Sequence, residues 1–496
     1  IFQKPNDDNF EHFFTAANFL SYSNACQVVR AANTTTTEAA APLNATANTG
    51  AYVNVQIKTS DDYYNSYDPD FGGSNATSFT ASVAAKWAGA LGNTFKISWC
   101  PSDRPSATLT GTVAWTESTS AIAGTGTNFG DELRVGDIVD IAGATPGIVI
   151  TAVTADNAAT GEELSGTQAD ISAGAALTRR KRSVYQQQSA DMAGTVTTAA
   201  DSTTVTGSAT VFSAQFVVGD IIVVGGEERK ISAIASDTSL TVSEKFIGVN
   251  ATAAYERKWE YASAFSEGPP TTSAFAEDKN LELDEIHVAI VDEDGDWTGT
   301  VDEVVEAHGN LSVIRDAKGA DGENIYYANY LNRESEYVWF ADHPIFNVPQ
   351  ADGTDDTETI DTGGGATITL TSGTVTGTFH GWGITSTAAL AQNITGGSAN
   401  NAFMMPHAPL STSLQGGSDG TDPSAADLIR AYDKMKSAED TDVSLLMTAN
   451  HGSTVVRHVI NNIAESRKDC VAFFSPEKTD VVGVTDSSTA TDNVVD

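Results

Sequence analysis

The sequence predicts an α/β protein with a mostly parallel or mixed sheet, into which an all-β region of two tandem small β-barrel or meander repeats is inserted. Three observations support this prediction. Short strand and helix patterns alternate in both outer parts of the chain. Between about Arg104 and Lys258, β-branched runs alternate with glycine turns instead. Within that region "VGDIV" (135–139) returns as "VGDII" (218–222), which indicates a duplicated unit.

The first part of the predicted α/β core covers residues 1–103. The phenylalanines of "NDDNFEHFFTAANFL" (6–20) recur at helical spacing behind an acidic first turn, which suits a helix dipole. Further elements are predicted as strands at 23–32, 52–58 and 94–100, and as a helix at 78–90.

The inserted region is predicted to form β module 1 (104–185) and β module 2 (186–258), the latter protruding. Aligned without a gap, residues 111–143 and 194–226 agree at 11 of 33 positions. Each copy carries a G-T-V start, a G-x-x-T-x-F segment and a V-G-D-I step. The glycine of this step supplies a positive φ for a tight turn, and its aspartate can cap the local backbone. The pair is expected to be an insertion between parts of the α/β core.

The core resumes at residues 259–348. "EIHVAIVD" (Glu285–Asp292) is a continuous apolar strand of the kind buried on both faces of a sheet. "TVDEVVEAHG" (300–309) is predicted as a helix with a capping box and a glycine stop. "EYVWFAD" (Glu336–Asp342) is predicted as another strand.

The last two predicted parts are a polar, Gly- and Thr-rich insertion at 349–405 and a further α/β part at 406–496. The insertion is predicted to be rich in loops, with one hairpin. Strand–helix–strand order in the final part favours a parallel sheet, and the polar tail is predicted to lack a closing element. The elements expected there are helix 424–436, strand 443–449, helix 453–467 and strand 470–475.

Size, charge and cysteine content bound the function. A chain of 496 residues suggests two to four domains. Its net charge of −38 repels nucleic acid and anionic membranes. Three scattered cysteines favour buried thiols in a reducing compartment over a disulfide framework or a zinc cluster. No apolar run is long enough to span a bilayer, and the start at Ile1 suggests an internal piece of a longer chain.

Four short motifs were weighed as candidate sites. The acidic run 292–296 resembles half of a calcium loop but breaks register after it, which favours an acidic surface turn over a metal site. His451, in "TANHG" (448–452), follows a predicted parallel strand but has no recognisable nucleophile or base beside it. "GGSDG" (416–420) lacks the spacing of nucleotide-binding loops, and "RRKR" (179–182) is expected to pair with acidic neighbours. No catalytic, cofactor-binding or metal-binding residue is therefore predicted, and no enzyme activity.

Three longer stretches resemble one protein family. "KWAGALGNTFKISWCP" (Lys86–Pro101), the segment Asp284–Asp342 and the segment Leu414–Pro476 resemble, in wording and in order, the contractile tail sheath proteins of T-even-type tailed bacteriophages. The acidic, Thr-rich composition is similar to that of marine cyanophage versions.

The resemblance implies a structural virion protein. Its subunits would form hexameric rings stacked as a helical sleeve around the tail tube protein, between baseplate and tail terminator proteins. Contraction of the sleeve would drive the tube through the host envelope for genome ejection. The protein would lie in the phage tail, and in the host cytoplasm during assembly, with no cofactor, no direct nucleic-acid contact and no membrane insertion. Family members also have terminal strands that tie neighbours together; these are not recognised here, so residues 1–496 alone are expected to stay monomeric in dilute buffer.

Two alternatives from other classes remain open. The β modules could be the functional part of a surface β-repeat adhesin or receptor-binding structural protein. The chain could also be a hydrolase that uses His451. Binding of the modules to cells and substrate screening would distinguish these alternatives from a sheath subunit.

Overall fold

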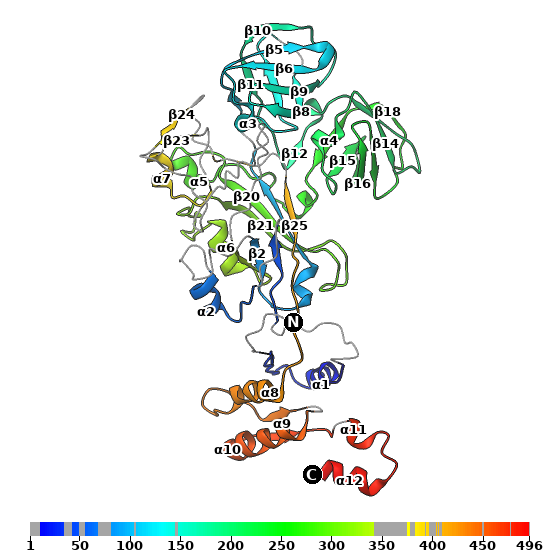
Figure 1. Cartoon of the computed structure of the whole chain (residues 1–496), viewed down its shortest axis with the longest axis vertical. Coiled ribbons are helices and arrows are strands. Elements are labelled where there is room, and N and C mark those ends of the chain that lie inside the picture. The colour runs from blue at the N-terminus through cyan, green and yellow to red at the C-terminus, as the bar shows by residue number, and fades with distance from the viewer. Residues whose placement is uncertain are drawn as a thin grey trace.

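Antiparallel sheets build most of the protein (Figure 1). Along the long axis of Figure 1, two β modules lie at one end, a central sheet lies in the middle, and a small helical lobe lies at the other end. The computed structural model describes residues 10–33, 42–48, 55–67, 81–103, 106–143, 147–341, 374–376, 382–391, 393–395, 403, 405, 409–448, 451–476 and 478–495.

The central sheet has the order β21-β20-β3-β25, and each neighbouring pair is antiparallel. Beside it lies a three-stranded antiparallel sheet of order β1-β2-β22. The main apolar core lies between these sheets and α6, where Trp99 packs edge-on against Tyr327. The strands are β1 (Thr46–Asn48), β2 (Ala81–Ala85), β3 (Phe95–Pro101), β20 (Glu285–Asp292), β21 (Glu303–Ser312), β22 (Val338–Phe340) and β25 (Leu410–Ser413).

The expected α/β core with a mostly parallel or mixed sheet is therefore wrong. In the segment 300–309, predicted as a helix, residues 303–309 lie in β21, which returns antiparallel to β20. The loop between these strands closes on Asp292, whose carboxylate accepts hydrogen bonds from the backbone of Trp297 and Thr298. Because this turn reverses the chain directly, no crossover helix is needed, and the valines of 303–312 follow their strand preference.

The prediction of a helix at 78–90 is also wrong. The middle of this segment forms β2, between β1 and β22, and Val83, Ala84 and Ala85 are fully buried there. Burial on both faces outweighs the helix preference of alanine. The segment 23–32, predicted as a buried strand, is irregular and largely exposed.

Each of the two modules is an eight-stranded antiparallel sheet, and both have the same topology. Module 1 has the order β10-β5-β6-β9-β8-β7-β11-β4; read from its other end, module 2 has the order β18-β13-β14-β17-β16-β15-β19-β12. Each strand of module 1 therefore corresponds to the strand of module 2 whose number is higher by eight. The strands of module 1 are β4 (Ala107–Thr108), β5 (Thr112–Thr116), β6 (Ala121–Thr125), β7 (Ile138–Ile141), β8 (Ile148–Ala155), β9 (Ala158–Glu163), β10 (Ile171–Ala175) and β11 (Leu177–Arg179). Those of module 2 are β12 (Gln186–Gln187), β13 (Thr195–Thr198), β14 (Thr204–Ser208), β15 (Ile221–Val224), β16 (Glu227–Ser236), β17 (Ser239–Val242), β18 (Asn250–Ala253) and β19 (Tyr255–Lys258).

The repeated G-x-x-T-x-F segment fastens a helical turn to a hairpin in each module. In module 1, Thr127 Oγ1 donates to the carbonyl of Asp156 (2.7 Å); in module 2, Thr210 Oγ1 donates to the carbonyl of Asp237 (2.5 Å). A side chain on the preceding glycine of either copy would overlap that threonine. The phenylalanine then begins a one-turn helix, α3 (Phe129–Glu132) or α4 (Phe212–Gln215), and is fully buried.

The V-G-D-I step forms the same tight turn twice. The glycines, Gly136 and Gly219, have positive φ values of 84° and 102°. The aspartates accept a hydrogen bond from the backbone three residues earlier, at Arg134 and Val217, each at 2.9 Å. In module 2 the same aspartate, Asp220, forms a buried ion pair with Arg257.

The C-terminal lobe, residues 421–495, holds a single strand–helix–strand unit. The strands β26 (Leu445–Met447) and β27 (Val471–Phe473) pair in parallel, joined by a helix over 453–467 that contains a π-helical turn. The parallel pairing expected there is thus confirmed, but only as two strands outside the core. The tail, predicted to lack an element, forms α12.

Other elements are short. The parallel pair β23 (Thr374–Thr376) and β24 (Asn393–Thr395) lies in the insertion 349–405, most of which is outside the described residues. In the described part of the chain, the α-helices outside the modules are α1 (Phe10–Leu20), α2 (Ser60–Asp62), α5 (Ala274–Asp278), α6 (Tyr327–Glu334), α7 (Ser386–Ala391), α8 (Ala425–Tyr432), α9 (Ser453–His458), α10 (Glu465–Arg467), α11 (Lys478–Val481) and α12 (Ser487–Val495).

Candidate functional site

Within the described ranges, no group of three or more His, Cys, Asp or Glu side chains is arranged to hold a metal ion. Among the helices of those same ranges, none combines the length and the apolar character needed to cross a bilayer.

The acidic run 292–296 is a structural turn. Both oxygens of the buried Asp292 carboxylate are used: one accepts from Thr94 Oγ1 at 2.5 Å, the other from Thr298 N and Oγ1 at 2.6 and 2.9 Å. Although burial opposes the charge, these hydrogen bonds lower the pKa of Asp292. The carboxylate closes the β20–β21 loop. The run is therefore a turn, as predicted, but Asp292 is buried and does not lie at the surface.

His451 lies where α1 meets the C-terminal lobe. Its ring centroid is 5.1 Å from that of His12 and 6.1 Å from that of Tyr432. Burial, with a smaller contribution from His12, lowers the pKa of His451. His451 therefore takes part in the packing between α1 and the lobe. The alternative that the chain is a hydrolase using His451 stays a hypothesis.

The Gly-rich segment 416–420 packs against the rest of the chain. Gly417 exchanges two hydrogen bonds with the side chain of Asn93, and the carboxylate of Asp419 accepts from the backbone of Ala90 at 3.0 Å. A side chain at Gly417 would overlap the carbonyl oxygen of Gly89. These close contacts account for the glycine at 417 by packing within the chain.

The basic cluster 179–182 connects module 1 to module 2. Arg180 forms ion pairs with Asp140 of module 1 (2.7 Å) and with Asp191 (3.4 Å), and Lys181 pairs with Asp103 (2.9 Å). The expectation that this cluster pairs with acidic neighbours is confirmed for these two residues.

Five charged side chains meet between module 2 and the central sheet. We call them the ionic joint: Lys96, Lys230, Glu260, Glu293 and Asp302. Asp302 lies between the two lysines, at 3.2 Å from Lys96 and 2.8 Å from Lys230. Burial opposes both lysine charges, yet the surrounding carboxylates raise the pKa of each lysine. No motif marks this cluster, because its members come from segments that are far apart in the sequence.

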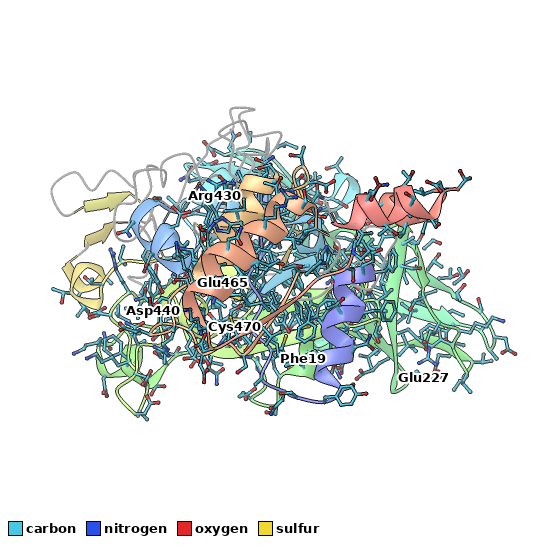
Figure 2. All side chains as sticks on the ribbon, turned by 90° about the horizontal axis from the view of Figure 1, so that it is seen from below. Phe19, Glu227, Arg430, Asp440, Glu465 and Cys470 are labelled. Carbon is cyan, nitrogen blue, oxygen red and sulfur yellow. The ribbon has the colours of Figure 1, made fainter. Side chains whose placement is uncertain are left out.

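The most open candidate surface is the face of the two-stranded sheet in the C-terminal lobe. Its helix-facing side is covered by the apolar stripe of the helix over 453–467, including Val455 and Val459. On the strands, Leu445, Val471 and Phe473 are 44%, 56% and 55% exposed. Figure 2 views the molecule from this end, with Arg430, Glu465 and Cys470 of the lobe labelled.

Sequence reasoning missed this surface. The apolar residues of 443–449 and 470–475 were interpreted as parts of a larger buried sheet, whereas only two strands form. The signal that could have revealed it is that a lone strand–helix–strand unit has just one helix to cover its sheet.

Comparison with known proteins does not extend these observations: no family model, no curated protein and no solved structure matches this chain.

Proposed function

We propose that this chain is a structural subunit of a contractile phage tail sheath, which assembles into hexameric rings stacked around a tail tube. The proposal starts from the resemblance of 86–101, 284–342 and 414–476 to sheath proteins. The observation that carries it further is the open sheet of the C-terminal lobe. A two-stranded sheet is marginal alone, and its strands have edges and an apolar face that further strands could cover.

Strand addition suits a sleeve. A helical stack needs heterologous contacts, in which each subunit offers two different surfaces. An added strand supplies main-chain hydrogen bonds, and apolar side chains such as Leu445 and Phe473 supply specificity. Subunits linked in this way can shift as rigid bodies without losing each other, as contraction requires.

The elongated arrangement also supports this proposal. The modules lie at the end of the molecule opposite the lobe (Figure 1). If the lobe holds the subunits together, the modules are free to project outward as decoration. The partners would be further copies of the chain, the tube, the baseplate and the terminator.

The test is to express the whole reading frame and to observe whether the protein assembles. Negative-stain electron microscopy and sedimentation velocity should reveal rings or sleeves, favoured by salt because the charge of −38 is then screened. The variant Phe473→Lys should abolish assembly without lowering Tm, since the side chain is 55% exposed. Ile247→Lys in module 2, at an 83% exposed position, is the matched control and should assemble normally. A monomer at every salt and protein concentration would refute the proposal.

A receptor-binding role of the modules is the second candidate. The loop between β17 and β18 presents Ile247 and Val249 to solvent, and its backbone is fixed by Glu227, which accepts hydrogen bonds from Ile247 N and Gly248 N at 2.9 and 2.7 Å. An ordered apolar tip is a feature of binding surfaces. Loss of cell binding in Ile247→Lys, with assembly unaffected, would favour this role.

A further inference from the structure

The two modules are joined to each other by an apolar contact. We call it the apolar joint: Ile138, Val149 and Leu164 of module 1 with Ala193, Val211 and Ala214 of module 2. All except Ala214 are at most 6% exposed. The V-G-D-I turn of module 1 lies at this joint, so close that a side chain on Gly136 would overlap the carbonyl oxygen of Ala214. Such a contact excludes water and tolerates little displacement.

Module 2 turns the corresponding face toward the central sheet. The strand registers place Lys230 where module 1 has Val149, since Ile138 pairs with Val149 and Ile221 pairs with Lys230. Near the turn glycine of module 2, Gly219, lies the Glu260 carboxylate. The same face that is apolar in the first joint is therefore charged in the second.

The ionic joint holds the second contact. Lys230 of β16 pairs with Asp302 of the β20–β21 loop at 2.8 Å and with Glu260 at 2.5 Å. The side chains of Lys230 and Asp302 remain 34% and 36% exposed. Partly exposed pairs of this kind are weak and are screened by salt.

A cavity adjoins the ionic joint. It has a volume of about 660 Å³ and is bounded by the turn of module 2 on one side and by Leu410 and Ser411 of β25 on the other. Val217 and Val218 of that turn are 43% and 61% exposed. In the apolar joint, Gly136 of the module 1 turn packs against Ala214 of α4, whereas Val217 and Val218 of the module 2 turn border the cavity.

We propose that the two modules move as one rigid body relative to the central sheet. The movement takes place at the ionic joint, and the chain segments around Tyr185 and Trp259 are the pivot. Those segments stay attached, because Tyr185 and Trp259 pack with Cys100 on the central sheet and Trp259 Nε1 donates to Ser98 Oγ at 3.1 Å. The ion pair of Lys230 with Asp302 sets the orientation of the modules relative to the central sheet when it is formed. The cavity gives room for the turn of module 2 to approach β25. This inference does not depend on the proposed function.

The test measures distances between pairs of spin labels by pulsed electron–electron double resonance. Labels are attached at Ser118→Cys in module 1, Thr204→Cys in module 2 and Asp278→Cys in the core, all exposed positions. Cys26 and Cys470 are replaced by serine, while the buried Cys100 is kept. The pairs 118/204 and 204/278 then report on the apolar joint and on the ionic joint, respectively.

The expected result is a difference between the two pairs. The 118/204 distribution should stay narrow from low to high salt, and the 204/278 distribution should broaden and shift as salt screens the joint. Lys230→Gln should produce that broadening already at low salt. The control Lys258→Gln, whose partner Glu228 lies within module 2, should not.

Two outcomes would overturn the proposal. One is a 204/278 distribution that stays narrow in high salt and in Lys230→Gln. The other is equal broadening of both pairs, which would mean that the modules move separately. If Lys230→Gln fails to fold, the salt series on the labelled protein with Lys230 intact decides between the same outcomes.

Discussion

Removal of Arg257 should strongly destabilise module 2. Arg257 and Asp220 are 1% and 2% exposed, and the guanidinium grips both carboxylate oxygens, at 2.6 and 3.1 Å. In Arg257→Met, the carboxylate keeps the hydrogen bond from Val217 N but stays buried without its counter-charge. Breaking a buried pair in this way costs about 3–5 kcal/mol. Opening of β15 and β19 should therefore become roughly 10² to 10⁴ times more frequent.

Hydrogen exchange followed by mass spectrometry measures this opening strand by strand. The double variant Asp220→Asn/Arg257→Met should recover most of the loss, since asparagine still accepts from Val217 N and carries no charge. Lys258→Gln, which breaks a partly exposed pair with Glu228, should cost less than about 1 kcal/mol. A free-energy change below about 1 kcal/mol for Arg257→Met would refute the reasoning.

Three further predictions concern other parts of the chain. Gly207→Ala should destabilise module 2 by about 1–3 kcal/mol in chemical denaturation, because the new methyl group overlaps Thr210 Oγ1; Gly207→Ala/Thr210→Ala should lose less stability if that overlap is the cause. Gly136→Ala should loosen the apolar joint, because it forces alanine into φ 84° and against Ala214, and faster exchange in α4 would reveal it. His287 is stacked on Phe265, and burial lowers its pKa, so the stability that it contributes is present above its unfolded pKa of about 6.5 and is lost as pH falls through the folded pKa. Tm should fall in that window, and it should fall less in His287→Gln; an unchanged pH profile in that variant would contradict the role of His287.

The repeat could be predicted from the sequence because its residues act locally. A side chain on Gly207 would overlap Thr210 three residues later, and Asp220 caps the backbone three residues away. Residues this close in sequence leave a pattern that is visible without a structure. The strands 94–100, 285–292 and 336–342 were visible for a related reason, since long apolar runs have few alternatives.

The topology of the core could not be predicted, because it depends on pairings between distant segments. Whether Val83 lies in a helix or a strand is decided by Phe340, its partner in β22. The direction of β21 is decided by the side chain of Asp292, which closes a loop that looked like the start of a helix. The ionic joint combines Lys96, Lys230 and Asp302 from three separate segments, so no local pattern marks it.

The pairing of β3 with β20 has a consequence for the order of folding. Ile97 lies opposite Ile290, although both modules intervene between them in the sequence. During synthesis β3 emerges early and must wait for its neighbour, exposing an apolar edge meanwhile. If the modules fold first, the long intervening chain becomes a compact unit whose ends already lie together, and closure costs far less entropy. The two modules would then assist folding of the core, and slow folding of a module would lead to aggregation of the central sheet.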